Sequence, residues 1–345
     1  MLFGSRSRES TPLEGVDVVL ADLDGVVYAG AGALPHAIES LLAAGASRAL
    51  GYITNNAART DASVAAHLNE LGLSVAPDEV VTSPQAGVRL LASLVEPGST
   101  ILVVGGEGLV VELEKAGFVV TRSADDAPAA VIQGFAPEVN WKQLAEAAFA
   151  LKLPIEEGGI PWIATNNDWT IPQSRGIAPG NGTLVSAVHT AVGRLATVAG
   201  KPETPIFEEA IARFGAASPL FIGDRLDTDI LGANRAGIPS ALVLTGIDRP
   251  KHVLAADPFS RPDFILSDLR ELHEPYPQAR TRRDGSVTVR DATVRIDGND
   301  VVIVSSGESQ IDLLRAGARV IWDSGRAIYG LNVDERLYAD PFHRP

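Results

Sequence analysis

The stretch VVLADLDGVVYAG (residues 18–30) decides how the chain is interpreted. An apolar run typical of a buried strand ends at Asp22 and Asp24, and Gly25 follows at once. Two carboxylates this close repel each other and hold protons more tightly, unless a positive charge lies between them. The question is therefore which other residues the fold brings to the end of this strand.

Composition limits the answer before any motif is considered. The 345 residues predict more than one domain, and the absence of cysteine excludes disulfides, zinc–thiolate sites and thiol nucleophiles. The N-terminal residues lack the apolar core of a signal peptide, and no stretch is long enough to span a membrane, so we expect a cytoplasmic protein. The net charge of −14 argues against nucleic acids and anionic membranes as partners.

Strand-like and helix-like segments alternate over residues 16–272, and this order predicts an α/β fold with a doubly wound parallel sheet, a Rossmann-like core. We expect a core over residues 14–97 and 187–272, with an α/β cap over 98–186 inserted into it. Residues 278–345 are predicted to form a small C-terminal α+β module.

Within this module, the sequence pattern predicts three kinds of element. Alternating apolar and polar residues over 285–306 predict a hairpin or meander. Residues 308–319 are predicted to form a helix, and VIWDSG (320–325) is interpreted as a strand.

Three more polar clusters follow predicted elements: TNN (54–56), GKP (200–202) and GDRLDTD (223–229). Ligands of open α/β sheets bind beyond the carboxyl ends of the strands, where such clusters meet. Taken singly, each cluster is typical of a turn, a loop, a helix start or a solvated acidic segment. All four clusters in this order favour a functional site.

The residue types in these clusters suit phosphoryl transfer. Asp22, Asp24 and Asp224 supply hard oxygen ligands, which Mg²⁺ prefers, and a metal ion would relieve their repulsion. Lys201 adds a compact positive charge. Thr54 and the backbone N–H groups of the next two residues, Asn55 and Asn56, are suited to binding phosphate oxygens.

The motifs DLDGVVY, ITNN, GKP and GDRLDTDI, in this order, resemble the haloacid dehalogenase superfamily of phosphatases, in the branch with a large α/β cap. The resemblance covers about residues 14–272. It implies that Asp22 is the nucleophile that forms an aspartyl-phosphate, and that Asp24 is the general acid and base.

The same resemblance implies the remaining site residues. Three residues hold the phosphoryl group: Thr54, Asn55 and Lys201. The metal contacts come from the Asp22 carboxylate, the Asp24 backbone carbonyl and Asp224, with Asp229 hydrogen-bonding at or near the metal.

The added C-terminal module makes the chain similar to actinobacterial glycerol 3-phosphate phosphatases, whose tail resembles an acetyltransferase fold. No glycine-rich pyrophosphate loop is recognisable in this module, so we expect it to bind no acetyl-CoA and to serve packing, assembly or regulation.

The predicted activity is a Mg²⁺-dependent phosphomonoesterase that hydrolyses glycerol 3-phosphate, with 2-phosphoglycolate or pyridoxal 5'-phosphate as alternative substrates. The partner is then a small phosphorylated metabolite, and a homodimer is compatible with the sequence. Two alternatives of another class are a receiver-like phospho-switch, which also uses an acidic cluster, a threonine and a lysine, and a metabolite-binding pseudoenzyme.

Overall fold

The computed structural model describes residues 10–173 and 175–340. Its contacts divide the chain into two compact units, one made of the residues up to Leu50 and from Ala217 onward, the other of Gly51–Ala216. Helices and parallel strands alternate in both units, which confirms the predicted α/β class. The two units do not follow the predicted limits of core, cap and module, and those limits stay a prediction.

In the first unit, neighbouring parallel strands lie in the order β15-β14-β13-β1. Their bounds are β1 (Val18–Ala21), β13 (Pro219–Gly223), β14 (Ser240–Val243) and β15 (Phe264–Leu266). Nearly every residue of these strands is buried, as in sheets that are covered on both faces. Ala21 of β1 is paired with Ile222 of β13, so the two strands end at the same level.

Short elements connect these strands. They are β2 (Tyr28–Ala29), β3 (Gly32–Ala33), α1 (Ala37–Gly45), η4 (Leu226–Ile230), α8 (Leu231–Arg235), α9 (Pro250–Leu254), η5 (Pro258–Ser260) and η6 (Leu269–His273). Among them, η4 is a single π-helical turn that runs directly into α8. Such turns are uncommon and often lie at functional sites, which directs attention to the end of β13.

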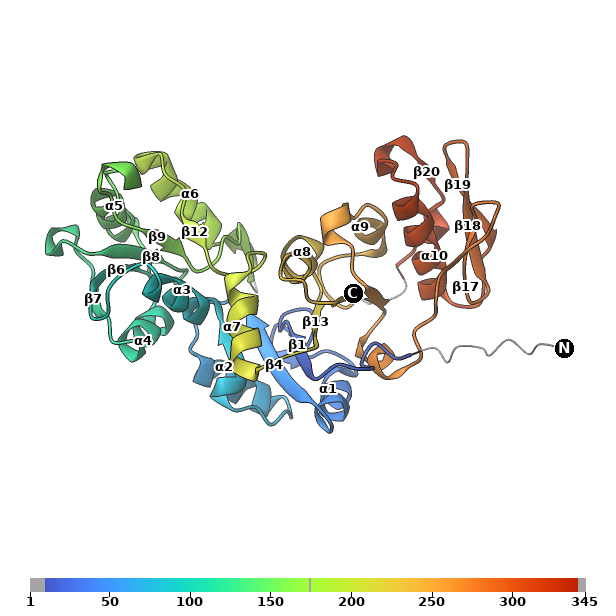
Figure 1. Ribbon diagram of the computed structural model, residues 1–345, viewed down its shortest axis with the longest axis horizontal. Helices are drawn as coiled ribbons and strands as arrows, with labels where there is room; N and C mark the ends of the chain where they lie inside the picture. Colours follow the sequence, from blue (N-terminus) through green and yellow to red (C-terminus); the bar gives the residue numbers. More distant parts are fainter. Residues whose placement is uncertain (1–9, 174, 341–345) are drawn as a thin grey trace. The chain divides into compact units, whose positions relative to one another are not determined.

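The second unit contains a parallel sheet in the order β12-β9-β8-β6-β7. Its strands are β6 (Thr100–Val104), β7 (Val119–Thr121), β8 (Ala130–Gln133), β9 (Trp162–Ala164) and β12 (Thr197–Val198). Figure 1 shows α5 and α6 on one face of this sheet and α3 and α4 on the other. The second unit also has strands outside this sheet: β4 (Ala49–Thr54) pairs with β5 (Val80–Thr82), and β10 (Thr170–Gln173) forms a hairpin with β11 (Gly176–Pro179).

The helices of the second unit are α2 (Asp61–Glu70), α3 (Ser83–Ala92), α4 (Glu107–Lys115), α5 (Trp141–Ala150), α6 (Asn181–Val192) and α7 (Pro205–Phe214), with the short turns η1 (Pro77–Glu79), η2 (Ala124–Asp126) and η3 (Ile155–Glu157). The sequence sets their starts. Thr82, for example, caps α3 by accepting a hydrogen bond from the backbone N–H of Gln85, whose side chain bonds back to the Thr82 N–H.

The C-terminal part of the first unit is a sheet in the order β16-β17-β18-β19-β20, with one long helix, α10 (Gln310–Asp323), packed on it. Its strands are β16 (Arg280–Thr281), β17 (Val287–Val289), β18 (Ala292–Asp297), β19 (Asp300–Ser305) and β20 (Asn332–Val333), and the turns η7 (Ile328–Gly330) and η8 (Glu335–Leu337) follow the helix. The antiparallel run β17-β18-β19 confirms the predicted meander.

The strand predicted at residues 320–325 is wrong, because α10 continues through Asp323. The apolar residues Ile311, Leu314, Ala318 and Ile321 recur at helical spacing and are all buried. A short apolar run such as VIW does not by itself distinguish a strand from the last turn of a buried helix.

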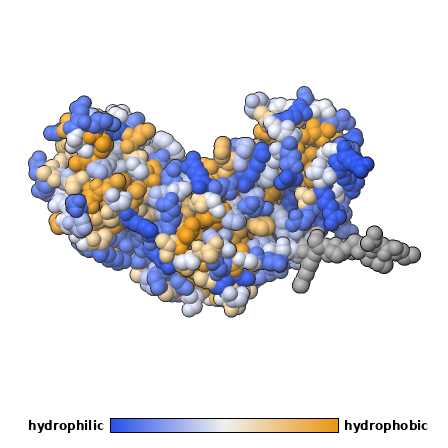
Figure 2. Space-filling view, in the orientation of Figure 1, coloured by the Kyte–Doolittle hydropathy of each residue, from blue (hydrophilic) through white to orange (hydrophobic). Residues whose placement is uncertain are grey.

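The surface mixes residue types. On the face drawn in Figure 2, hydrophobic residues lie in patches between hydrophilic ones. Among residues 10–173 and 175–340, no helix is both long enough and apolar enough to cross a bilayer.

A buried arginine joins α10 to the parallel sheet of the first unit. The Arg315 guanidinium donates to the carbonyl of Ile265 at 3.0 Å and 2.6 Å, and to the Asp312 carboxylate at 2.8 Å. It also pairs with Glu271 and lies 4.6 Å from the centre of the Tyr276 ring. Since Arg315 is only 6% exposed, these partners replace the water that the charge loses on burial.

We predict that Arg315→Met lowers the free energy of unfolding by about 3 kcal/mol, because the buried Asp312 and the partly buried Glu271 lose a positive partner. Arg319→Met is the matched control on the same helix, since Arg319 is 56% exposed and pairs with Asp323 on the surface. It should cost less than about 1 kcal/mol. Urea unfolding of both variants measures the difference, and equal losses would contradict this account.

Candidate active site

Three buried carboxylates meet at the ends of β1 and β13. Asp22, Asp224 and Asp229 each offer one oxygen, and these oxygens lie within 4.8 Å of one another. The three residues are 8%, 1% and 0% exposed. Asp24, two residues after Asp22, is exposed, and its carboxylate is not one of the three. A group of three carboxylates this close together could hold a metal ion.

The paired strands explain why Asp22 and Asp224 are neighbours. The backbone N–H of Asp22 donates to the carbonyl of Ile222 at 2.8 Å, so Asp22 extends the β1–β13 pairing by one residue. Gly25 then turns the chain with φ +83°, and a Cβ at this position would lie 2.3 Å from Asp224 Oδ2. The glycine after the two aspartates is therefore required both by its backbone conformation and by the carboxylate beside it.

Asp229 reaches the group from the π-helical turn η4. Its Oδ2 accepts hydrogen bonds from the backbone N–H groups of Asp224 and Arg225, both at 3.1 Å. A Cβ at Gly223 would lie 2.2 Å from the Asp229 Cβ, so only glycine fits at the end of β13. Asp229 thus fixes the backbone that carries Asp224 while its carboxylate stays in the cluster.

A loop that the sequence analysis missed, residues 245–248, packs on the same cluster. The Ile247 N–H donates to Asp224 Oδ2 at 2.6 Å, and Thr245 Oγ1 donates to the Gly25 carbonyl at 2.7 Å. A Cβ at Gly246 would lie only 1.9 Å from Asp224 Oδ2. The available signal was a Thr-Gly pair directly after the apolar run SALVL, which places another turn at the end of a strand.

The donor set of the carboxylate cluster fits a hard divalent cation. All three groups are carboxylates, with no histidine among them, and the chain has no cysteine. Oxygen-only sites of this kind suit Mg²⁺ or Ca²⁺ better than zinc or copper. The burial of the three side chains adds to this fit, because a cation there would be little screened by solvent.

The predicted phosphate-binding residues lie in the second unit. Thr54 ends β4 as a buried residue, and its Oγ1 accepts a hydrogen bond from the Asn56 N–H at 3.1 Å. The Asn55 side chain holds the backbone of Lys201 on both sides: Oδ1 accepts from the Lys201 N–H at 2.8 Å, and Nδ2 donates to its carbonyl at 3.0 Å. The structure thus brings Asn55 and Lys201 together across 146 residues of sequence, while Asn56 is exposed.

Residues that the sequence analysis did not assign hold Asn55 in place. Its carbonyl accepts hydrogen bonds from Asn166 Nδ2 at 2.7 Å and from Ser83 Oγ at 2.8 Å, and its own Nδ2 also donates to Asp168 Oδ1 at 3.2 Å. Asn181 Nδ2 in turn donates to the Asn166 carbonyl at 2.8 Å. This network fixes the Lys201 backbone, and the ATNND run after β9 was its signal in the sequence.

Comparisons with known proteins agree with this architecture. Residues 19–119 match the model of the haloacid dehalogenase-like hydrolase family, and residues 198–272 match a second, HAD-hydrolase-like model. Together with the curated relatives described next, these matches show that the chain belongs to the haloacid dehalogenase-like hydrolases.

Among those relatives is the D-glycerol 3-phosphate phosphatase of Mycobacterium tuberculosis, 41% identical over 90% of this chain and 87% of the relative. The glycerol-3-phosphate phosphatase of Gallus gallus is 35% identical over 70% of this chain and 83% of its own. A crystal structure of the glycerol phosphate phosphatase from M. tuberculosis in complex with magnesium superposes with a TM-score of 0.84 and 37% identity, covering 94% of each chain.

We predict that Gly246→Ala weakens the binding of divalent cations by about tenfold or more, because the added methyl group displaces the Asp224 carboxylate. Gly32→Ala is the matched control, since a Cβ there meets no atom within 4 Å and the residue does not need a positive φ. Calorimetric titration with Mg²⁺ compares the two variants. Equal affinities in folded samples would show that Gly246 does not support the site.

Proposed function

We propose that this chain is a Mg²⁺-dependent phosphomonoesterase that hydrolyses glycerol 3-phosphate to glycerol and phosphate through an aspartyl-phosphate on Asp22. The observation that carries the proposal is the buried group of Asp22, Asp224 and Asp229 at the ends of two paired strands. The substrate follows from the relatives, because those from M. tuberculosis and G. gallus are both named as phosphatases of glycerol 3-phosphate.

In this proposal, the carboxylates of Asp22 and Asp224 and the backbone carbonyl of Asp24 hold the metal ion, and Asp229 hydrogen-bonds at or near it. The ion, when bound, supplies positive charge that lowers the repulsion between the phosphoryl oxygens and the attacking carboxylate. The oxygen-only donor set and the magnesium complex of the M. tuberculosis structure support this choice of ion.

The first chemical step is carried by Asp22 and Asp24. A carboxylate oxygen of Asp22 attacks phosphorus, and the ester bond between phosphorus and the glycerol oxygen breaks. Asp24, in its protonated form, gives its proton to the departing oxygen, so that glycerol leaves as a neutral alcohol. The exposure of Asp24 supports this role, since its carboxyl group has access to substrate and solvent.

The second step returns the enzyme to its starting state. Asp24, now a carboxylate, takes a proton from a water molecule as the water attacks the phosphorus of the aspartyl-phosphate. The bond between phosphorus and the Asp22 oxygen breaks, which releases inorganic phosphate and restores the Asp22 carboxylate. Asp24 is left protonated, and is ready to serve as the acid in the next cycle.

Thr54, Lys201 and backbone N–H groups of the Asn55 segment bind the phosphoryl oxygens in this proposal. Lys201 is 4% exposed, so its charge acts in a medium that screens it weakly. The Asn55 side chain is engaged with the Lys201 backbone, so we assign it the positioning of that lysine and leave phosphate binding to the backbone of its segment.

Three further features of the protein belong to the proposal. We infer that the C-terminal extension is similar to an acetyltransferase fold, which its sheet with a single long helix supports, but that it serves packing, assembly or regulation. We also propose a cytoplasmic location and a homodimer; size-exclusion chromatography with light scattering tests the second of these.

The substrate is tested by phosphate release with Mg²⁺ from glycerol 3-phosphate, 2-phosphoglycolate, pyridoxal 5'-phosphate and a nucleoside monophosphate. We expect the highest kcat/KM with glycerol 3-phosphate, many turnovers per chain and loss of activity with a chelator. A preference for another ester would change the substrate assignment, but the protein would still be a phosphomonoesterase. A single phosphorylation per chain without turnover would favour the phospho-switch, and binding without any phosphorylation would favour the pseudoenzyme.

We predict that Asp22→Asn reduces phosphate release to below detection, because a neutral amide does not attack phosphorus. Asp227→Asn is the control: Asp227 is a 67% exposed carboxylate near Asp224 in sequence, it pairs with Arg225, and it lies outside the carboxylate cluster. Its variant should keep nearly full activity. Robust turnover by Asp22→Asn would contradict the assignment of the nucleophile.

A further inference from the structure

The loop of residues 245–248 connects the carboxylate cluster to the C-terminal part of the chain. As described above, it donates to Asp224 Oδ2 through Ile247 and to the Gly25 carbonyl through Thr245. The Asp248 N–H adds a third bond, to the Asp224 carbonyl, at 3.2 Å. The loop therefore sets the position of the Asp224 carboxylate and its backbone, and of the turn that follows Asp24.

Asp248 ties the same loop to the start of the π-helical turn. Its Oδ2 accepts a hydrogen bond from the Leu226 N–H at 2.5 Å, and its other oxygen lies 2.8 Å from Nδ1 of His252. The Asp248 side chain is only 15% exposed, so these contacts are largely shielded from solvent. Asp248 thus joins the loop 245–248 to the start of η4, and Asp224 is held between these two segments.

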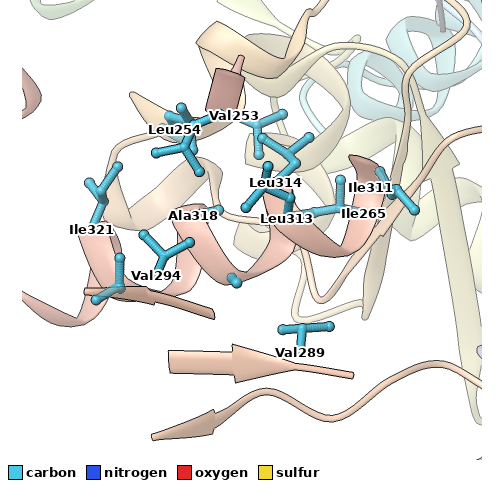
Figure 3. Packing of buried hydrophobic residues seen from close by; sticks show 14 of the residues in the cluster. Val253, Leu254, Ile265, Val289, Val294, Ile311, Leu313, Leu314, Ala318 and Ile321 are labelled. Carbon is cyan, nitrogen blue, oxygen red and sulfur yellow. The ribbon is translucent and has the colours of Figure 1, made fainter. Parts of the chain in front are cut away.

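The helix α9 begins two residues after Asp248 and has only five residues. A helix this short has no stability of its own, so tertiary packing must fix its position. Val253 and Leu254 are 0% and 2% exposed, and they belong to one hydrophobic cluster with the residues of α10. Figure 3 shows both side chains against α10, on the side of the helix away from Val289.

Direct contacts also stabilise the packing of α9 against α10, which we call the α9–α10 seam. Trp322 Nε1 donates to the Val253 carbonyl at 3.1 Å, which satisfies a backbone group of α9. A Cβ at Gly317 of α10 would lie 3.6 Å from Leu254 Cδ2, so the two helices are in close contact there. Arg249 and Asp340 add an ion pair at 3.4 Å, which is partly exposed and contributes little.

We propose that the C-terminal module is a positioning element for the metal site: α10 holds α9, and α9 holds the loop 245–248 against Asp224. This inference rests on the proposed function, because it takes Asp224 as a metal ligand. In this role the module supports every catalytic cycle and does not need to bind a ligand itself. Leu254 and Trp322 are then positioning residues.

The test compares Mg²⁺ binding by calorimetry in the full-length protein and in three variants. Leu254→Ala opens a gap in the seam, and Trp322→Phe removes the hydrogen bond to Val253 while keeping an aromatic ring. Val289→Ala is the matched control, because it removes buried methyl groups from the same cluster on the other side of α10. Thermal melting of each variant reports whether it is folded and how much stability it has lost.

We expect the Kd for Mg²⁺ to rise by about tenfold in Leu254→Ala and severalfold in Trp322→Phe, and to change less than about twofold in Val289→Ala. The KM for Mg²⁺ should follow the Kd, while kcat at saturating Mg²⁺ stays near that of the unmodified protein. If Leu254→Ala does not fold, Trp322→Phe carries the test.

Unchanged affinity in the folded seam variants would overturn the inference, and so would an equal loss in the control, because general destabilisation would then explain it. Failure of the proposed function has a different signature. In that case the unmodified protein itself would bind no Mg²⁺, whatever the variants do.

Discussion

The repulsion among Asp22, Asp224 and Asp229 is the constraint on which the rest of the structure depends. Three carboxylates with oxygens within 4.8 Å of one another are withdrawn from water, which is costly for each of them when ionised. The parallel pairing of β1 with β13 brings Asp22 and Asp224 together, because it ends both strands at one level, and η4 adds Asp229. In the function proposed here, a divalent cation bound among these carboxylates lowers their repulsion, which would link metal affinity to the fold.

The surroundings of the cluster are built to prevent the carboxylates from moving apart. Gly25 and Gly246 leave no room for a side chain beside Asp224, and backbone N–H groups hold both Asp224 and Asp229. Packing farther from the cluster also holds the carboxylates in place. The short helix α9 cannot hold the loop 245–248 by itself, so it depends on packing against the long, amphipathic α10. If these carboxylates hold the ion as proposed, a preorganised group of this kind avoids reorganisation when the ion and the phosphate ester bind.

Much of this could be predicted from the sequence, because the chemistry lies in short motifs at strand ends. The strands themselves are apolar runs, so the positions of Asp22, Thr54 and Asp224 follow from where each run stops.

Contacts between distant segments could not be predicted in this way. The Thr-Gly pair at 245–246 signals a turn, but not that the turn lies beside Asp224, and nothing local signals the bonds from Asn55 to Lys201. In both cases the partner lies far along the chain. The last turn of α10 was missed for a related reason: tertiary burial decides between helix and strand in a short apolar run.

The central claim is that one divalent cation binds among these carboxylates, and anomalous diffraction from crystals soaked in Mn²⁺ tests it most directly. The account predicts one strong peak per chain, within about 2.5 Å of oxygens of both Asp22 and Asp224. A peak elsewhere in the chain, or none at the ends of β1 and β13 in well-ordered crystals, would contradict it.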